Sequence, residues 1–557
     1  MRSGVRGKTF SGHYRRILSF SLLTGIVFLV YVQVATHDFI SYDDRIYVTN
    51  NEYVRSGLSV DNIKRAFSIK GLSSRTYYHP VTWISHMTDV QLFGLNPGMH
   101  HIVSALIHTL NTALLFYLLL IATGSLPASL LTALIFGLHP IGVDSVAWLA
   151  ERKNILSATF WMLALLAYVR YAQGRKAALY LLVVGCFALG LLTKSSIVAL
   201  PGVLILMDFW PLKRIWFGEK AAGNLRIRDM ARAFRPRVTM KVLMLEKIPL
   251  VAMSAASVYV STISLRNAVV PTSLIPMTLR LENAVVACAK YLWKAILPMD
   301  LTFFYPYPES VPAWKVAGAA TILLTISCLV LREVYRRPYL LFGWLWFLVT
   351  IFPILGIMQG GQWPEIAERW AYIPLIGIYA AFSWGAVEFY TRMKGTLSGK
   401  VAVGALAAMV AILGGLTWNQ VGYWKNNYLL YTHGIDVNPG NYVAHNNLGK
   451  VLLEMNRIDD AITHYRTAVN LSSDFQEANY NLGVAYLRKN DVEKSLTFFD
   501  RAIQLDPDDW EAYLGLGVMY LNKGSLDKAA DALPKSLQLS ADNNPQAYLN
   551  LGNVYHR

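Results

Sequence analysis

The chain has 557 residues, of which 54% are hydrophobic and only 15% are charged. This composition excludes an ordinary soluble enzyme and predicts a polytopic membrane protein. The net charge of +16 divides into +20 before Gly422 and −4 from Gly422 onward. We therefore assign the excess of Lys and Arg to the cytoplasmic loops of a membrane domain and expect no nucleic-acid partner.

Apolar runs long enough to span a bilayer recur along the chain as far as residue 418. They lie at about 17–36, 99–123, 126–143, 154–172, 177–193, 195–212, 248–265, 313–331, 338–358, 370–388 and 400–418. A further run, 281–298, differs from these because it contains Glu282, Lys290 and Lys294.

The placement of Lys and Arg sets the predicted topology. Five segments are basic: 2–16, 170–176, 213–247, 332–337 and 392–400. All five are cytoplasmic only if the region 266–312 enters and leaves on one side, so we interpret 281–298 as a re-entrant or interfacial helix. The result is an all-α membrane domain at 17–421 with about eleven crossings. Residues 1–16 are then cytoplasmic, and the C-terminus is extracytoplasmic.

The first external loop in this topology covers residues 37–98 and contains two adjacent acids, Asp43 and Asp44. They lie directly after the first span, where the poorly solvated membrane surface makes charged side chains costly. Two interpretations are open: a general base or metal-binding acid, or an N-cap and a solvated loop residue. Farther along this loop, Ser59 is the predicted N-cap of a short helix.

Other polar clusters are predicted on the same external face. His139, Asp144 and Glu151 could ligate a metal or belong to a capped helix turn. Arg152 and Lys153 could hold a phosphate or extend their cationic ends to the membrane surface, and the same two readings apply to Lys194.

Two more external segments are candidates for substrate contact. Glu365 and Arg369 are four residues apart and would form an ion pair if helical, while Arg369 could equally clamp a phosphate. The aromatic run that contains Tyr305 is either a membrane-interface belt or a contact for a sugar or an isoprenoid.

A repeat with a period of 34 residues begins at about residue 440, after a predicted linker at 422–439. Leu-Gly pairs mark it at 448–449, 482–483 and 516–517, and Leu551-Gly552 begins a fourth, partial unit. Small residues recur where paired helices would touch, as in tetratricopeptide repeats. We therefore predict an α-solenoid over residues 440–557, with three full repeats.

The order of the motifs resembles a known family. Asp43-Asp44 is followed by Tyr78-His-Pro-Val-Thr, Leu138-His-Pro-Ile-Gly-Val-Asp-Ser-Val-Ala-Trp, Leu192-Thr-Lys, Ala367-Glu-Arg-Trp-Ala-Tyr-Ile-Pro and then the repeats. This series resembles the transmembrane and tetratricopeptide-repeat O-mannosyltransferases and their bacterial relatives, within the GT-C glycosyltransferases. The resemblance covers nearly the whole chain.

The resemblance implies transfer of a sugar from a polyprenyl-phosphate carrier to a Ser or Thr hydroxyl of an acceptor protein. It implies that Asp43 or Asp44 is the catalytic base, and that Glu368, Arg369 and Lys194 match family positions. Where relatives carry Arg-Pro after the first loop, this chain has His79-Pro80. The family also places its repeats on the catalytic side of the membrane.

These inferences combine into one expected site. Asp43 and Asp44 are the catalytic candidates. The donor-phosphate candidates are Arg369, Glu368, Lys194, Arg152 and Lys153. The candidate substrate contacts are His79, His139, Asp144, Glu151 and Tyr305. A divalent metal is compatible with this hypothesis and not required by it.

The expected partners are a polyprenyl-phosphate sugar lipid, the lipid bilayer and an acceptor protein held in the groove of the repeats. The expected location is a bacterial inner membrane, with the repeats in the periplasm. An alternative function is a non-enzymatic membrane anchor whose repeats assemble an envelope or polysaccharide-export complex. A lipid-linked glycan ligase or polymerase fits less well, because its working loop usually lies in the second half of the chain.

Overall fold

The computed structural model describes residues 3–68, 78–217, 234–236, 239–264, 270–359, 363–540 and 544–557. It is almost entirely helical and confirms the predicted all-α class, with one short antiparallel ribbon of β1 (Ile215–Phe217) and β2 (Phe234–Pro236). The chain divides into two compact units. The first comprises Met1–Leu301 and Tyr307–Lys425, and the second comprises Thr302–Pro306 and Asn426–Arg557.

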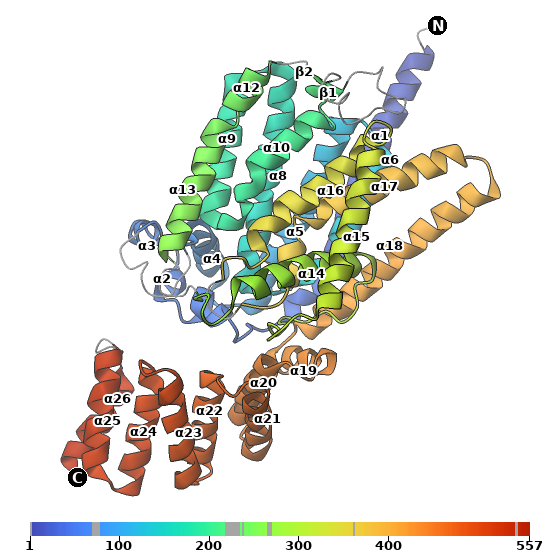
Figure 1. Ribbon diagram of the computed structural model, residues 1–557. Coiled ribbons are helices and arrows are strands. Elements are labelled where there is room, and N and C mark those ends of the chain that lie inside the picture. Colours follow the sequence, from blue (N-terminus) through green and yellow to red (C-terminus); the bar gives the residue numbers. More distant parts are fainter. Residues whose placement is uncertain are drawn as a thin grey trace. The chain divides into compact units, whose positions relative to one another are not determined.

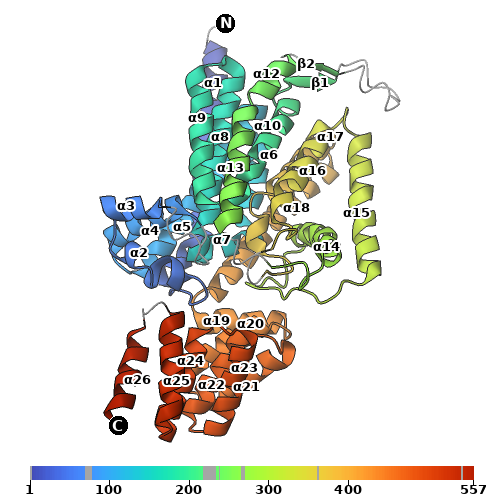
Figure 2. The ribbon, with the colours of Figure 1, turned by 60° about the vertical axis from the view of Figure 1, so that its left-hand side comes forward.

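The first unit is a bundle of long apolar helices (Figures 1 and 2). Its helices are α1 (Ser3–Tyr31), α5 (Pro97–Thr123), α6 (Leu126–Leu138), α8 (Arg152–Gly174), α9 (Ala177–Thr193), α10 (Leu200–Phe209), α13 (Ile248–Ser264), α15 (Ala313–Arg332), α16 (Pro338–Ile351), α17 (Leu375–Arg392) and α18 (Leu397–Tyr423). Local chemistry sets their ends. The Asn96 side chain accepts the amide of Met99 at the start of α5, and Gly124 ends that helix at a φ of 75°.

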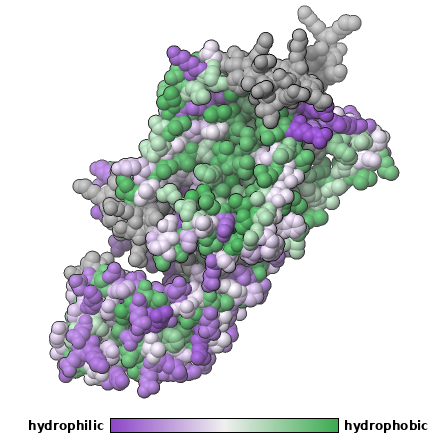
Figure 3. Space-filling view, in the orientation of Figure 1, coloured by the Kyte–Doolittle hydropathy of each residue, from purple (hydrophilic) through white to green (hydrophobic). Residues whose placement is uncertain are grey.

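The protein is a membrane protein. Six helical segments among the described residues are long and apolar enough to cross a bilayer: 13–36, 97–123, 149–174, 240–264, 313–332 and 397–423. A seventh span results if 126–138 and 140–147, which are bent by 56°, count as one. Three shorter apolar helices accompany them. Figure 3 shows apolar surface over much of this unit and largely polar surface over the second. The eleven crossings remain a prediction.

Helix α14 (Met277–Ile296) covers most of the run predicted to be interfacial. It lies across the other helices in both views (Figures 1 and 2). Asn283, Ala287 and Tyr291 are buried at helical spacing, whereas Trp293 is 62% exposed. One side of α14 is therefore buried and the other exposed, and its interfacial placement stays a prediction.

The predicted first external loop forms short helices at one end of the bundle. They are η2 (Arg45–Thr49), α2 (Glu52–Arg55), α3 (Val60–Ala66) and α4 (Pro80–Phe93). The predicted cap at Ser59 is confirmed, because its side chain accepts the amide of Asn62 at 3.0 Å. The ribbon β1–β2 lies at the other end of the bundle from α2, α3 and α4 (Figures 1 and 2).

The second unit confirms the predicted repeats. Its helices are α19 (Asn427–Val437), α20 (Tyr442–Glu454), α21 (Ile458–Leu471), α22 (Gln476–Arg488), α23 (Val492–Leu505), α24 (Trp510–Lys523), α25 (Leu526–Leu539) and α26 (Pro545–His556). The small and large residues that defined the period pack between paired helices, as Ala461, Tyr465 and Phe499 do with fully buried side chains.

Residues 302–306 and the predicted linker differ from expectation. The segment 422–439 contains α19, which starts where Asn426 accepts the amide of Leu429 at 3.0 Å. The ring of Tyr431 packs on Phe303 with 5.5 Å between centroids. Phe303 and Phe304 are therefore buried in the second unit instead of forming a membrane belt.

The Gly of the first three Leu-Gly pairs permits this close packing. A Cβ added to Gly483 would lie 2.7 Å from the ring of Phe499, whereas one added to Gly552 would meet nothing within 4 Å. Gly483→Ala is therefore expected to destabilise the repeats by about 1–3 kcal/mol through overpacking. Gly552→Ala is the matched control and should be neutral or slightly stabilising, because Ala favours helix. Hydrogen exchange of α22 and α23 in the full chain measures the difference, and equal protection in both variants would contradict it.

Candidate active site

Asp44 joins the first loop to the segment before α8. Its carboxylate accepts the amide of Ile40 through Oδ2 and the amide of Ala150 through Oδ1, both at 2.8 Å. The residue is fully buried, and this burial raises the pKa of Asp44 to about 7. With both oxygens bonded to backbone, Asp44 holds the loop in place.

Asp43 differs from its neighbour. Its side chain is partly exposed, and its carboxylate has no hydrogen-bond partner among the described residues. Burial raises the pKa of Asp43 above its ordinary value of 3.8, as does the negative charge of Glu151, while Lys153 and Arg369 act against this rise. Asp43 is therefore an accessible carboxylate with increased basicity.

Glu151 gathers three cations. Its carboxylate lies 2.9 Å from Nζ of Lys153, 3.4 Å from Nζ of Lys194 and 3.4 Å from Nε of Arg369. The four residues come from the turn before α8, the start of α8, the α9–α10 junction and η8 (Glu368–Ala371). Sequence-distant cations thus converge on one buried carboxylate.

Arg369 has a second acidic neighbour, Asp144, and two aromatic neighbours, Trp148 and Trp370. Its Nη1 lies 3.4 Å from Oδ2 of Asp144, and its guanidinium carbon lies 5.0 Å from the ring centre of Trp148. Three cations, Lys153, Lys194 and Arg369, face the carboxylates of Glu151 and Asp144 in this cluster, and an ionised Asp43 balances the third positive charge.

The predicted ion pair between Glu365 and Arg369 is wrong. Ala367 is extended with a φ of −141°, so these two residues are not on one helical turn. Glu365 pairs with Lys290 of α14 instead. Glu368 is buried, and its charge acts on Lys294 of the same helix.

Two other sequence candidates in the first unit bond to groups outside the cluster. Arg152 is fully buried, and each of its three guanidinium nitrogens bonds a group outside the cluster, namely Ser104, Asp89 and the carbonyl of His100. His139 uses both ring nitrogens, with the carbonyl of Ala295 and the amide of Ile141, so it is not a metal ligand with Asp144 and Glu151. Tyr305 belongs to the second unit.

His79 borders the cluster through Tyr47. The Tyr47 hydroxyl lies 3.0 Å from Nδ1 of His79, and Nζ of Lys153 lies 4.4 Å from the centre of the Tyr47 ring. Tyr47 and Asn154 are members of the site that the sequence motifs did not single out. The Asn154 amide donates to Glu151 at 2.8 Å and to the Arg369 carbonyl at 3.1 Å, and Asn154 Oδ1 accepts from Lys194.

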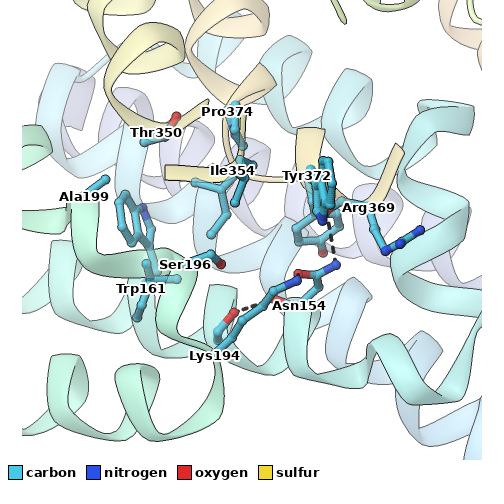
Figure 4. Close-up of a pocket in the computed structure, with 14 residues that line it drawn as sticks. Asn154, Trp161, Lys194, Ser196, Ala199, Thr350, Ile354, Arg369, Tyr372 and Pro374 are labelled. Carbon is cyan, nitrogen blue, oxygen red and sulfur yellow. Dashed lines mark hydrogen bonds between the residues drawn. The ribbon is translucent and has the colours of Figure 1, made fainter. Parts of the chain in front are cut away.

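A cleft opens beside Lys194 and Arg369 (Figure 4). The close-up shows Asn154 and Arg369 on one side, with the side chain of Lys194 extended toward Asn154, while Trp161 and Ala199 lie on the other side and Ile354 between them. Its further lining includes Ile197, Ile373 and Pro374. The cleft therefore combines a cationic end with an apolar wall.

Comparison with known proteins agrees with the resemblance found in the motifs. The tetratricopeptide repeat model matches residues 446–509 and 499–544. The chain is 23% identical to protein O-mannosyl-transferase TMTC1 of Homo sapiens over 488 residues, 81% of this chain and 55% of that protein. It is 23% identical to protein O-mannosyl-transferase TMTC4 of Homo sapiens, over 77% of this chain and 63% of that protein.

A third relative is protein O-mannosyl-transferase tmtc2 of Xenopus laevis, 22% identical over 72% of this chain and 56% of that protein. The chain thus spans between about half and two thirds of the length of these curated relatives. Among solved structures, a crystal structure of MamA protein is 28% identical over 23% of this chain and 69% of that chain, with a TM-score of 0.22.

Proposed function

We propose that the protein is a GT-C type membrane glycosyltransferase. It moves a sugar from a polyprenyl-phosphate-linked donor to a Ser or Thr hydroxyl of an acceptor protein on the extracytoplasmic side. The observation that carries this proposal is an unbonded carboxylate, Asp43, whose pKa is raised by burial and lowered by the charges of Lys153 and Arg369. Glu151 holds both of these cations together with Lys194, and Arg369 and Lys194 line an apolar cleft. The names of the curated relatives make mannose the first sugar to test.

Asp43 is the base in the proposed reaction. Its carboxylate takes the proton of the acceptor hydroxyl while that oxygen attacks the anomeric carbon of the sugar. The bond between this carbon and the phosphate oxygen breaks, and polyprenyl phosphate leaves with the bonding electrons. Attack opposite the leaving phosphate inverts the anomeric configuration. Asp44 does not compete for this role, because both its oxygens are bonded to backbone amides.

Lys194 and Arg369 stabilise the phosphate as its charge grows. Both line the cleft, and Glu151 fixes them before the donor arrives. The apolar wall formed by Ile197, Ile354 and Ile373 suits the first isoprene units of the carrier. The repeats of the second unit are the proposed binding surface for the acceptor protein.

Lys194→Met tests the phosphate contact. Loss of one charge-assisted bond of about 1.5–3 kcal/mol is expected to lower kcat/KM for the donor roughly 10- to 100-fold. Lys290→Met is the control, because Lys290 pairs with Glu365 and does not line the cleft, and it should keep donor kinetics within about twofold. Transfer from a synthetic mannosyl phosphopolyprenol in nanodiscs measures both. Equal donor kinetics in the two variants would refute this role for Lys194.

The pH dependence of transfer tests the base. A base must be ionised, and burial holds the pKa of Asp43 above 3.8, so activity should be lost as pH falls through this raised value. Lys153 lowers the pKa of Asp43, and its replacement in Lys153→Met should move the acid limb to still higher pH. Lys290→Met should leave the limb in place. An acid limb that does not move in Lys153→Met would contradict the assignment.

A further inference from the structure

A second cluster lies between α4 and α5, apart from the residues of the proposed reaction. It consists of His86, Asp89 and His100, each of which offers a ligand atom within 4.8 Å of the other two. All three are buried, with exposed fractions of 0%, 3% and 0%. Buried imidazole and carboxylate groups need partners, because an unsatisfied polar group costs free energy.

The tautomer of His100 is fixed by its other neighbour. Nε2 of His100 lies 2.9 Å from the carbonyl oxygen of Gly94, which can only accept, so Nε2 carries the hydrogen. The lone pair of a neutral His100 is then on Nδ1, which has no hydrogen-bond partner among the described residues. A histidine that ligates a metal through one nitrogen commonly donates from the other to a backbone carbonyl.

The lone pair of His100 faces a carboxylate. Nδ1 of His100 and Oδ2 of Asp89 are 3.6 Å apart. Two ligands bound tetrahedrally to zinc at about 2.0–2.2 Å are about 3.3–3.5 Å from each other. The observed separation is therefore close to that of a shared zinc ion, whereas two facing acceptors without a cation would repel.

His86 supplies the third ligand. Both of its ring nitrogens are buried and have no hydrogen-bond partner among the described residues. Arg152 bonds Asp89 and the backbone carbonyl of His100 and so holds these two residues in place beside such an ion. One lone pair of a carboxylate oxygen can accept from Arg152 while another coordinates the ion.

We propose that His86, Asp89 and His100 bind a zinc ion, whose fourth position is taken by water. Two imidazoles and one carboxylate suit zinc, and no cysteine is required. The ion joins α4 to α5 and, through Asp89 and Arg152, to the start of α8, which carries Lys153. Its role is structural, and the proposal does not depend on the proposed transfer reaction.

Zinc content of the full chain tests this site. The protein is expressed with zinc in the medium, purified without a polyhistidine tag and analysed by mass spectrometry for metals. The wild type is expected to hold one zinc per chain, and His86→Ala and His100→Ala are expected to hold none. His108→Ala is the control, since His108 is also buried but bonds Tyr372 and the Gly137 carbonyl, and it should keep its zinc.

A second measurement uses only the wild type, in case the variants fail to fold. After removal of metal by a chelator, added Zn²⁺ should raise Tm in a concentration-dependent way. Added Co²⁺ should give the visible d–d absorption of a tetrahedral site. A wild type without stoichiometric zinc, whose Tm does not respond to Zn²⁺, would overturn the proposal. Full zinc retention in folded His86→Ala and His100→Ala would overturn it as well.

Discussion

Asp43→Asn is expected to lower the rate of sugar transfer by a factor of about 10²–10⁴, the usual contribution of a general base. The amide has the shape of the carboxylate and cannot take the proton of the acceptor hydroxyl. Stability should be unchanged, because the Asp43 side chain bonds to nothing among the described residues. Radiolabelled transfer in nanodiscs gives the rate, and thermal unfolding gives the stability.

Two variants in the same loop serve as comparisons for Asp43→Asn. Asp44→Asn replaces a carboxylate that accepts two backbone amides, so it should lower Tm, since hydrogen bonds to charged groups are worth about 1.5–3 kcal/mol each. Asp61→Asn, on the exposed side of α3 in the same loop, should change neither the rate of transfer nor Tm. Wild-type activity in Asp43→Asn, or lost activity with intact stability in Asp44→Asn, would remove Asp43 from the role of base. Wild-type activity in both would favour the scaffold hypothesis.

Glu151→Gln is expected to have the largest effect on stability. Glu151 is the shared partner of Lys153, Lys194 and Arg369, and all four side chains are nearly buried. Removing one partner from a buried ion network leaves charges uncompensated, which typically costs 3–5 kcal/mol. The rate of sugar transfer should fall as well, because Lys194 and Arg369 lose the carboxylate of Glu151, which fixes them beside the cleft.

Glu365→Gln is the matched control for Glu151→Gln. Glu365 also pairs with a lysine, but the Lys290 side chain is 39% exposed, and exposed ion pairs contribute about 0–1 kcal/mol. Thermal unfolding of both variants in the same lipid nanodiscs makes the comparison. Equal Tm values for the two variants would show that Glu151 is not the centre of the cation cluster.

The repeats and most apolar helices could be predicted from the sequence because their signals are local. The 34-residue period and the span lengths follow from which residues meet within one helix pair or one bilayer thickness. The helix within the predicted linker at 422–439 could not be predicted in this way. This helix, α19, forms because Leu430 and Tyr431 find buried positions in the second unit, which no local pattern shows.

Partner choice within the site could not be predicted, because it depends on tertiary packing. Arg152 and Lys153 are adjacent, but successive residues at the start of a helix point about 100° apart. One therefore meets Asp89 and the other meets Glu151. The same limit applies to Arg369, whose partners Asp144 and Glu151 are more than two hundred residues away in the chain.

A structure of the Asp43→Asn chain with a mannosyl phosphopolyprenol bound tests the central claim most directly. The account predicts that the phosphate lies within hydrogen-bond distance of Lys194 and Arg369. It also predicts that the first isoprene units follow the wall of Ile197 and Ile354, and that residue 43 faces the anomeric carbon. A phosphate bound elsewhere, with residue 43 remote from the sugar, would contradict the account.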